Sequence, residues 1–522
     1  MPGAMHLEFR RAHFALLLFL FVAIRSSILA LHAQNADAVA PAIPKTWVDE
    51  EIATLEVPLA DPVGSPKHVS ADYYYRVPVR PIYKSYPVYA PGREPQGYED
   101  WLKQQQPEII WDDKGHRPPL KTQADWIKAG EIVFDAPSAY GGLVSQGRSG
   151  LYVREPQFLA NTGAPIARDG TLPFFRYVVQ KKGEVKVAIL SCGTCHTRVM
   201  PDGSVLKGAQ GNLPFDRVFA YDYSVYFHAP AEIARQVERF LYATPWIRTD
   251  ALPNEDRMSL AEIAQVHTSI PPGVIARHRT SPFAPVQVPD LIGVKNRKYL
   301  DRTGLQQHRS IVDLMRYASL NQDMDPDASF DGFIPADFPD FKKLPPPETG
   351  ERYSDEQLYA LALYVYSLQP PPNPNRFDAL ARRGQKVFQM EGCATCHTPP
   401  LYTNNKLTLA VGFTPPLGAE EKYNILPISV GTDPDLAMKT RRGTGYYKVP
   451  SLKGVWYRGM FGHSGWCATL EDWFDPSRVR DDYVPTGFKP YGTKTYAVKG
   501  HPFGLNLSES DRKALIAFLK TL

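Results

Sequence analysis

A five-residue pattern, Cys-x-x-Cys-His, occurs twice in this chain, at 192–196 and at 393–397. In each copy, two thiols three residues apart can form thioethers with one haem, and the next residue offers an imidazole to the iron. The two copies use four of the five cysteines in the sequence. We therefore predict two covalently bound haem c groups. The attachment cysteines and proximal iron ligands are Cys192, Cys195 and His196 for haem 1, and Cys393, Cys396 and His397 for haem 2.

Other uses of paired cysteines explain less of this pattern. A structural zinc site would have to join two pairs about two hundred residues apart, and it gives no reason for a His after each pair. A thioredoxin-like redox pair needs one reactive Cys-x-x-Cys beside a βαβ unit, and ordinary disulfides need no His. The remaining Cys467 is expected to be a small buried hydrophobic residue without a redox role.

Composition places the chain among globular proteins. Its 522 residues, 43% hydrophobic and 22% charged, are enough for about two domains with separate cores. A net charge of +4 without a Lys/Arg run gives no indication of nucleic-acid binding. The 49 prolines predict long ordered loops between the periodic segments.

The N-terminus has the pattern of a secretory signal, with Arg10 and Arg11, an apolar run at 13–24 and small residues up to Ala33. An uncleaved anchor is the alternative, but Arg25 ends the run well short of the roughly 20 apolar residues that a membrane span needs. We expect cleavage after Ala33, a periplasmic or secreted protein, and no stable membrane span in the mature chain.

An internal repeat organises the rest of the chain. A Gly-x-x-Val-Phe phrase, a Val-Pro-x-Leu-x-Gly-Val phrase and a closing helix follow one another in both halves. The closing helices align without a gap, and each begins with a Ser that has Gln or Asp three residues later, close to a capping box. The three landmarks are 130–134, 288–294 and 354–368 in the first half, and 384–388, 449–455 and 508–522 in the second.

The repeat predicts a mainly α fold of two tandem cytochrome c-type domains. A loop-rich, Pro-rich N-terminal extension precedes them, and we expect it to pack over the core. A small β-hairpin, expected at 174–180 and 184–190, leads into the first haem motif. The expected units are signal peptide 1–33, extension 34–120, domain 1 at 121–369 with an insert at 137–190, linker 370–375, and domain 2 at 376–522.

Together with the turn at 461–465, these landmarks resemble the bacterial di-haem cytochrome c peroxidase/MauG superfamily over residues 122–522. The resemblance implies two facing cytochrome c domains, an N-terminal haem that binds peroxide and a C-terminal haem that transfers electrons. A small redox donor protein, a cytochrome or a cupredoxin, would supply those electrons. The long insert and the phrase at 501–504 are more similar to the rubber-oxygenase-like branch, in which a similar di-haem core binds dioxygen.

The distal ligand of each haem decides its function, because an iron with two strong protein ligands transfers electrons and one with an open position can bind peroxide or O2. For haem 2 the candidates are His501, Met460 and His463. We prefer His501, because similar proteins of the rubber-oxygenase branch place a His just before the last helix. Met460 is the alternative distal ligand, and His463 is expected to hydrogen-bond within a turn.

For haem 1 the repeat predicts an open or weakly held sixth position, which would make it the catalytic haem. The first-half counterparts of the candidate ligands are Pro347, which cannot ligate iron, Tyr299 and Arg302. Tyr299 could be a phenolate ligand, while Arg302 could stabilise charge at an oxygen ligand or pair with a haem propionate. Histidines from outside the repeat could also reach this iron, namely His228, His267, His278 and His308.

The sequence thus favours an exported di-haem peroxidase-like oxidoreductase that takes a small oxidant, peroxide or O2. A non-catalytic di-haem electron-transfer protein and a di-haem oxygenase of the rubber-oxygenase type remain alternatives. Three tryptophans follow the second Val-Pro phrase and are either core residues or an electron path: Trp456, Trp466 and Trp473.

Overall fold

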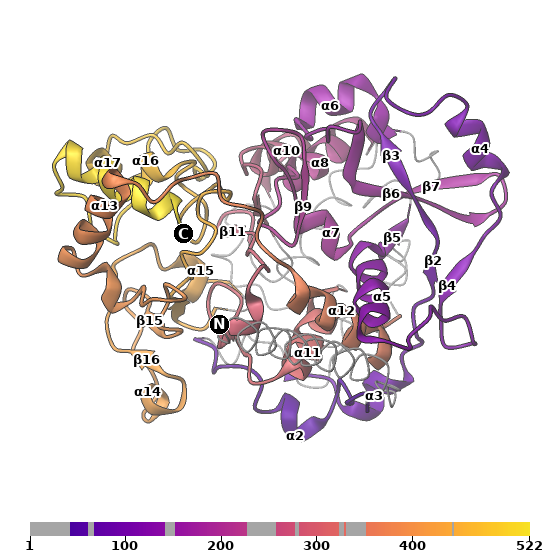
Figure 1. Ribbon diagram of the computed structural model, residues 1–522, viewed down its shortest axis with the longest axis horizontal. Coiled ribbons are helices and arrows are strands. Elements are labelled where there is room, and N and C mark those ends of the chain that lie inside the picture. Colours follow the sequence, from indigo (N-terminus) through magenta and orange to yellow (C-terminus); the bar gives the residue numbers. More distant parts are fainter. Residues whose placement is uncertain are drawn as a thin grey trace, which may run out of the picture.

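The computed structural model of the chain is shown in Figure 1. It describes residues 42–60, 67–140, 152–226, 257–276, 281–322, 328–329, 351–440 and 443–522. The expected signal peptide at 1–33 lies outside the described residues. Elements that follow residue 376, coloured orange to yellow, gather on the left of the view, and most elements of the first half lie on the right (Figure 1).

Helices of moderate length form the frame of each half, and shorter helices and single turns connect them. The longer ones are α5 (Gln123–Asp135), α11 (Ile311–Gln322), α12 (Asp355–Ser367), α13 (Ala379–Met390) and α17 (Glu509–Lys520). The shorter ones are α2 (Asp49–Ile52), α3 (Ala71–Arg76), α4 (Tyr98–Gln104), α6 (Pro156–Thr162), α7 (Cys192–Cys195), α8 (Phe215–Tyr221), α10 (Leu260–Thr268), α14 (Ala419–Lys422), α15 (Asp435–Met438) and α16 (Leu470–Trp473).

The closing helix of each half crosses the helix that carries the Gly-x-x-Val-Phe phrase, α12 over α5 and α17 over α13. A Cβ atom on Gly130 would stand 2.0 Å from the carbonyl oxygen of Ala360, and one on Gly384 would stand 1.8 Å from that of Ala514. Each crossing therefore needs a glycine, because no side chain fits between backbones this close. Since Ala360 and Ala514 align in the repeat, the two crossings are built from matching residues.

Three strands that lie between α5 and the first Cys-x-x-Cys-His motif in the sequence join a strand of the N-terminal extension in a four-stranded antiparallel sheet. Its order is β3-β6-β7-β5. Strands β6 and β7 form a hairpin where the sequence predicted one, with Lys181 paired to Glu184 around a turn at Gly183, whose φ is +83°. The strands are β3 (Ser85–Tyr89), β5 (Ala139–Tyr140), β6 (Thr171–Lys181) and β7 (Glu184–Ile189).

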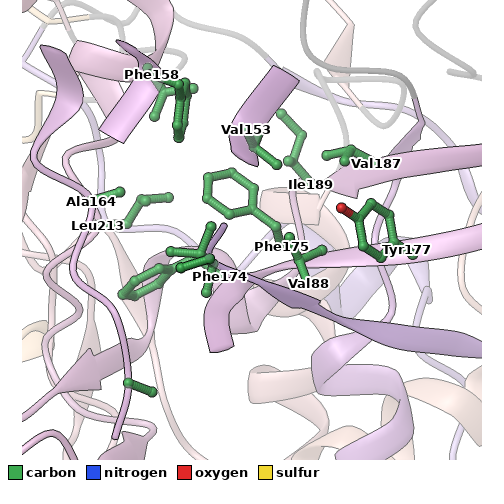
Figure 2. Close-up of a cluster of buried hydrophobic side chains, with 14 of the residues drawn as sticks. Val88, Val153, Phe158, Ala164, Phe174, Phe175, Tyr177, Val187, Ile189 and Leu213 are labelled. Atoms are coloured by element: carbon green, nitrogen blue, oxygen red, sulfur yellow. The ribbon is translucent and has the colours of Figure 1, made fainter. Parts of the chain in front are cut away.

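The N-terminal extension is part of this sheet. Strand β3 pairs with β6, with Tyr86 opposite Tyr177. The sheet packs with α6 and α8 in a hydrophobic cluster that includes Phe158, Phe174 and Phe175 (Figure 2). The rings of Phe158 and Phe175 meet edge to face, with centroids 6.0 Å apart. Residues 85–89 therefore pack over the core, as the sequence led us to expect, and anchor the extension to the first half.

The remaining strands are two or three residues long and pair locally. The second half holds one three-stranded sheet, β16-β15-β17. These short strands of both halves are β1 (Lys67–His68), β2 (Ile82–Tyr83), β4 (Ile109–Trp111), β8 (Thr197–Val199), β9 (Val205–Lys207), β10 (Val274–Ile275), β11 (Val286–Gln287), β12 (Tyr299–Leu300), β13 (Gln306–Gln307), β14 (Ala328–Ser329), β15 (Leu407–Leu409), β16 (Ile425–Leu426) and β17 (Tyr446–Lys448).

The described part of the chain is therefore helical with several small sheets, rather than mainly α with one hairpin. Strands this short leave no alternating pattern in the sequence, so tertiary contacts decide where they form. Within the described ranges, none of the helices combines the length and the apolar character that crossing a bilayer requires.

Candidate cofactor sites

The second Cys-x-x-Cys-His motif follows α13 directly and begins with a single helical turn at Cys393–Thr395. Nδ1 of His397 lies 3.1 Å from the carbonyl oxygen of Pro450 and 3.2 Å from that of Tyr402. A hydrogen bond from Nδ1 to a carbonyl fixes the tautomer in which Nε2 carries the free electron pair. The imidazole is thus oriented as a metal ligand.

His501 faces His397 across a cavity. The centroids of the two rings are 6.4 Å apart, with an angle of 57° between the planes. Two metal–imidazole bonds of about 2 Å each, with the two rings on opposite sides, give a similar separation. The spacing therefore fits one metal ion held between the two rings.

The cavity between these rings also suits a large apolar group. Both motif cysteines, Cys393 and Cys396, line it together with His397 and His501. Most of its remaining wall is hydrophobic, and includes Phe388, Leu452, Val455, Leu470, Phe474 and Leu519. The two thiols, the facing imidazoles and the apolar walls together fit a covalently attached haem.

Burial keeps both facing imidazoles neutral. It lowers the pKa of His501 to about 3, with further lowering from His397 and Arg478, and it also lowers the pKa of His397. Nδ1 of His501 is buried and has no hydrogen-bond partner among the described residues. Neutral imidazole is the form that ligates a metal, so the environment favours ligation over protonation.

Arg478 holds the loop that presents His501. Its side chain is fully buried and lies 4.6 Å from the ring centroid of Trp473. The guanidinium donates to the carbonyl oxygens of Gly500, at 3.0 Å, and of His501, at 2.9 Å. His501 itself has a φ of +45°, an unusual conformation for a non-glycine residue, so the loop depends on these bonds. No periodic pattern in the sequence indicates this long-range role, and we did not predict it.

The other two candidates for the distal side of haem 2 are not paired with His397 in this way. Met460 packs in a hydrophobic cluster with Val274 and Trp466, away from the described lining of the cavity. The ring of His463 does line the cavity and stacks on Tyr447, with centroids 4.1 Å apart. Of the three predicted candidates, His501 is thus the one that the structure brings opposite His397.

The first motif repeats the proximal arrangement of the second. Cys192 begins the short helix α7, which Ser191 caps by accepting a hydrogen bond from Thr194. Nδ1 of His196 lies 3.0 Å from the carbonyl oxygen of Pro289. Pro289 and Pro450 occupy the same position of the repeated Val-Pro phrase, so that phrase supplies the carbonyl that orients each proximal histidine. Its recurrence in the sequence was the signal from which this role could have been inferred.

The structure removes one candidate ligand of haem 1 and leaves others untested. Both ring nitrogens of His308 are engaged, by the Arg297 carbonyl at 2.8 Å and by the Tyr366 hydroxyl at 2.6 Å. Nδ1 of His267 lies 2.8 Å from a carboxylate oxygen of Asp216. Three positions weighed for this haem lie outside the described residues: His228, His278 and Pro347.

Tyr299 does not lie as we expected. Its hydroxyl donates to the carbonyl of Tyr423, and it packs with Leu407 and Tyr446 of the second half. Burial raises the pKa of Tyr299, which opposes the phenolate form. We correct the expectation accordingly: Tyr299 is a core residue at the contact between the halves. Counting along the repeat misplaced it, because the repeat gives the order of residues in the sequence but not the half that a side chain faces.

Arg302 lines the cavity of the second motif, not a site beside the first. Burial and the nearby Arg458 and Arg297 lower its pKa to about 9. Lys448 and Arg458 line the same cavity. Arg302 therefore belongs to a group of cations beside the second motif. This position corrects our expectation that Arg302 stabilises charge at haem 1.

The aromatic residues after the second Val-Pro phrase are mostly packed. The rings of Trp473 and His501 lie 5.4 Å apart between centroids, and Trp466 is buried against His463. Cys467 is fully buried, and burial raises the pKa of its thiol to about 12, in keeping with a hydrophobic role.

Comparisons with known proteins give distant likenesses. No protein-family profile and no curated protein matches the chain. A structure of Kuenenia stuttgartiensis hydrazine synthase, pressurised with xenon, is 16% identical over 46% of this chain and 73% of that chain, with a TM-score of 0.26. A MauG-like protein associated with microbial copper homeostasis is 16% identical over 45% of this chain and 75% of that chain, with a TM-score of 0.27. At these scores the likeness does not establish a shared fold.

Proposed function

We propose that this protein is an exported di-haem c-type oxidoreductase in which the two haems have different tasks. Haem 2, attached at Cys393 and Cys396, would be held on both faces by His397 and His501 and would transfer electrons. The observation that carries this proposal is the 6.4 Å separation of those two rings across a cavity that the motif cysteines line.

Haem 1, attached at Cys192 and Cys195 with His196 as proximal ligand, would be the site that takes a small oxidant. In the sequence repeat, the counterpart of His501 is Pro347, which cannot ligate iron. When bound, a haem with one open position supplies an iron that binds peroxide or O2 and exchanges electrons. We favour peroxide as the oxidant, with a small cytochrome or cupredoxin as the electron donor and the periplasm as the location.

The chain's own residues would orient the cofactors and exclude water. The carbonyls of Pro289 and Pro450 keep the proton of each proximal histidine on Nδ1. Arg478 fixes the backbone on either side of the distal imidazole of His501. The apolar wall of the cavity around Phe388 and Leu515 would shield haem 2 from solvent, which suits an electron carrier more than a substrate site.

Spectroscopy of the purified mature protein tests this assignment. We expect a mass increment of two haems, one low-spin and one high-spin ferric haem, and peroxide-dependent oxidation of a reduced small cytochrome. Two low-spin haems without turnover would instead indicate a plain electron carrier. A colourless protein with the mass of the bare polypeptide would contradict haem binding altogether.

A further inference from the structure

Four cationic side chains gather where the two halves meet. Arg297 and Arg302 come from the first half, and Lys448 and Arg458 come from the second. Burial lowers the pKa of Arg302 and of Lys448, and the charges of nearby arginines of the group lower both pKa values further. Three of the four, all except Arg297, line the cavity that holds Cys393 and His397.

The hydrogen-bond partners of these cations are mostly neutral carbonyl groups. Nζ of Lys448 donates to the carbonyl of Tyr299 at 3.2 Å. Arg458 donates to the carbonyl of Ser451 at 2.9 Å, and Arg302 lies 3.3 Å from that of Gln287. Carbonyl groups satisfy N–H donors without neutralising them, so these bonds leave the positive charge in place.

Two carboxylates act on the group. Asp290 lies 4.0 Å from Nε of Arg458 and also accepts from the Tyr457 hydroxyl at 2.9 Å. Asp301 acts on Arg302 and Lys448 at longer range. If all four basic groups are charged, they exceed these two carboxylates by two positive charges among the described residues, and Nε of Arg458 is buried there without a hydrogen-bond partner. Buried charge of one sign is costly unless an opposite charge meets it.

We propose that Arg297, Arg302, Lys448 and Arg458 form a carboxylate-binding site whose ligands are the propionates of haem 2, and that haem attachment thereby joins the two halves. This inference rests on the proposed function for the identity of the carboxylates. A haem carries a pair of propionates, which matches the surplus of positive charge. Because each half contributes two of the cations, the propionates would bind both halves at once.

The decisive test is whether two substitutions change the Tm in opposite directions in the presence and in the absence of haem 2. Lys448→Met and Arg302→Gln are made in the wild-type chain and in a Cys393→Ala/Cys396→Ala parent that lacks haem 2. With haem 2 present, we expect each substitution to lower the Tm, because a propionate loses its partner. In the parent without haem 2, we expect the same substitutions to raise the Tm, because repulsion within the group is relieved. A fall in both parents, or no change in either, would overturn the inference.

Inorganic phosphate separates the two possible sources of the anion. Phosphate could raise the Tm of the parent without haem 2 as much as haem 2 does, and Lys448→Met could abolish that rise. In that case the site takes a free anion, and the assignment to propionates is wrong. We expect only a small rise, removed by the same substitution. Lys513→Met is the matched control, because Lys513 is exposed and pairs with Glu509 on α17.

The midpoint potential of haem 2 gives a second readout if the parent without haem 2 does not fold. A nearby cation disfavours the more positive oxidised iron, so Lys448→Met and Arg458→Gln should each lower the potential relative to Lys513→Met. An unchanged potential in both would contradict the proposed site. A wild-type protein without covalent haem would remove the proposed function itself, whereas normal haem content with no effect of these variants would remove this inference alone.

Discussion

The two halves of the molecule share the helix crossing and the contact that orients the proximal histidine, and they differ in most of what surrounds these two features. In both, a glycine lets the closing helix cross the helix before the motif, and the proximal histidine bonds to the proline carbonyl of the Val-Pro phrase. In the second half Cys393 stands nine positions after Gly384, whereas in the first half Cys192 stands 62 positions after Gly130. Strands β5, β6 and β7 of the four-stranded sheet fill much of that difference.

This comparison teaches which parts of such a half can vary independently. The helix crossing and the histidine–proline bond are both repeated, and under the proposed function they would set the position of one face of each haem. In the second half, the loop before the closing helix carries His501, fixed by Arg478, and would supply the other face. We infer that two haems with different tasks arise from one frame by changing the distal loop and the insert.

The largest expected effect is the separate loss of each cofactor. Cys393→Ala/Cys396→Ala should lower the protein mass by one haem, and Cys192→Ala/Cys195→Ala should do the same for the other haem, because thioethers need the thiols. Mass spectrometry and the haem absorbance measure both. Cys467→Ala is the control and should retain both haems. If either double variant kept two haems, the assignment of one haem to each half would be wrong.

The helix crossings should respond alike in both halves. Gly130→Ala and Gly384→Ala each place a Cβ atom about 2 Å from a backbone carbonyl, and overpacking of this kind costs about 3 kcal/mol. Urea denaturation measures the change in the free energy of unfolding. The exposed Lys386→Ala on α13 should leave it unchanged. A cost in only one half would show that the crossings are not equivalent.

We expect the free energy of unfolding to depend on pH through His463, a residue of the second half. Burial lowers the pKa of His463 to about 3, and the unfolded chain protonates a histidine near pH 6.5. Below about pH 6.5 the unfolded state gains a proton that the folded state does not, so stability falls as the pH falls, by at most about 1.4 kcal/mol per pH unit. This contribution is fully present above pH 6.5 and declines down to about pH 3.

His463→Gln should flatten that slope in denaturation measured between pH 6.5 and 4. The exposed Lys386→Ala on α13 is the control and should leave the slope as it is. Arg302→Gln should flatten the slope slightly, because the Arg302 charge contributes to the lowered pKa of His463. An equal slope in wild type and His463→Gln would indicate that another group controls the acid sensitivity.

The smallest effects concern the starts of the closing helices. Ser354 accepts a hydrogen bond from the Gln357 amide, and Ser508 accepts one from the Asp511 amide, both at 3.1 Å. Ser354→Ala and Ser508→Ala should each cost about 1 kcal/mol. We expect the larger cost at Ser508, because its hydroxyl also donates to a carboxylate oxygen of Asp511 at 2.9 Å and the substitution removes both bonds. Chemical denaturation against Lys513→Ala measures both costs, and equal costs would indicate that the bond to the carboxylate adds nothing.

Local pattern predicted the parts of the molecule that are local. The closing helices, their caps at Ser354 and Ser508, and the hairpin around Gly183 all lie where the sequence placed them. Each depends on periodicity or on turn chemistry within about fifteen residues. Whether the halves are separate cytochrome c domains stays a prediction.

Contacts between distant segments could not be predicted in the same way. The bonds from Arg478 to the loop of His501 and the gathering of Lys448 with Arg302 join segments that carry no shared pattern. Tyr299 was misassigned for the same reason, because the repeat fixes sequence order but not which half a side chain faces.

The central claim is that His501 is the distal ligand of haem 2, and one variant tests it directly. In His501→Ala, we predict that the low-spin ferric haem becomes high-spin and that the reduced protein binds CO at one more haem than wild type does. Met460→Ala, the matched control, should keep the low-spin signal. A low-spin haem that survives in His501→Ala but disappears in Met460→Ala would contradict the account.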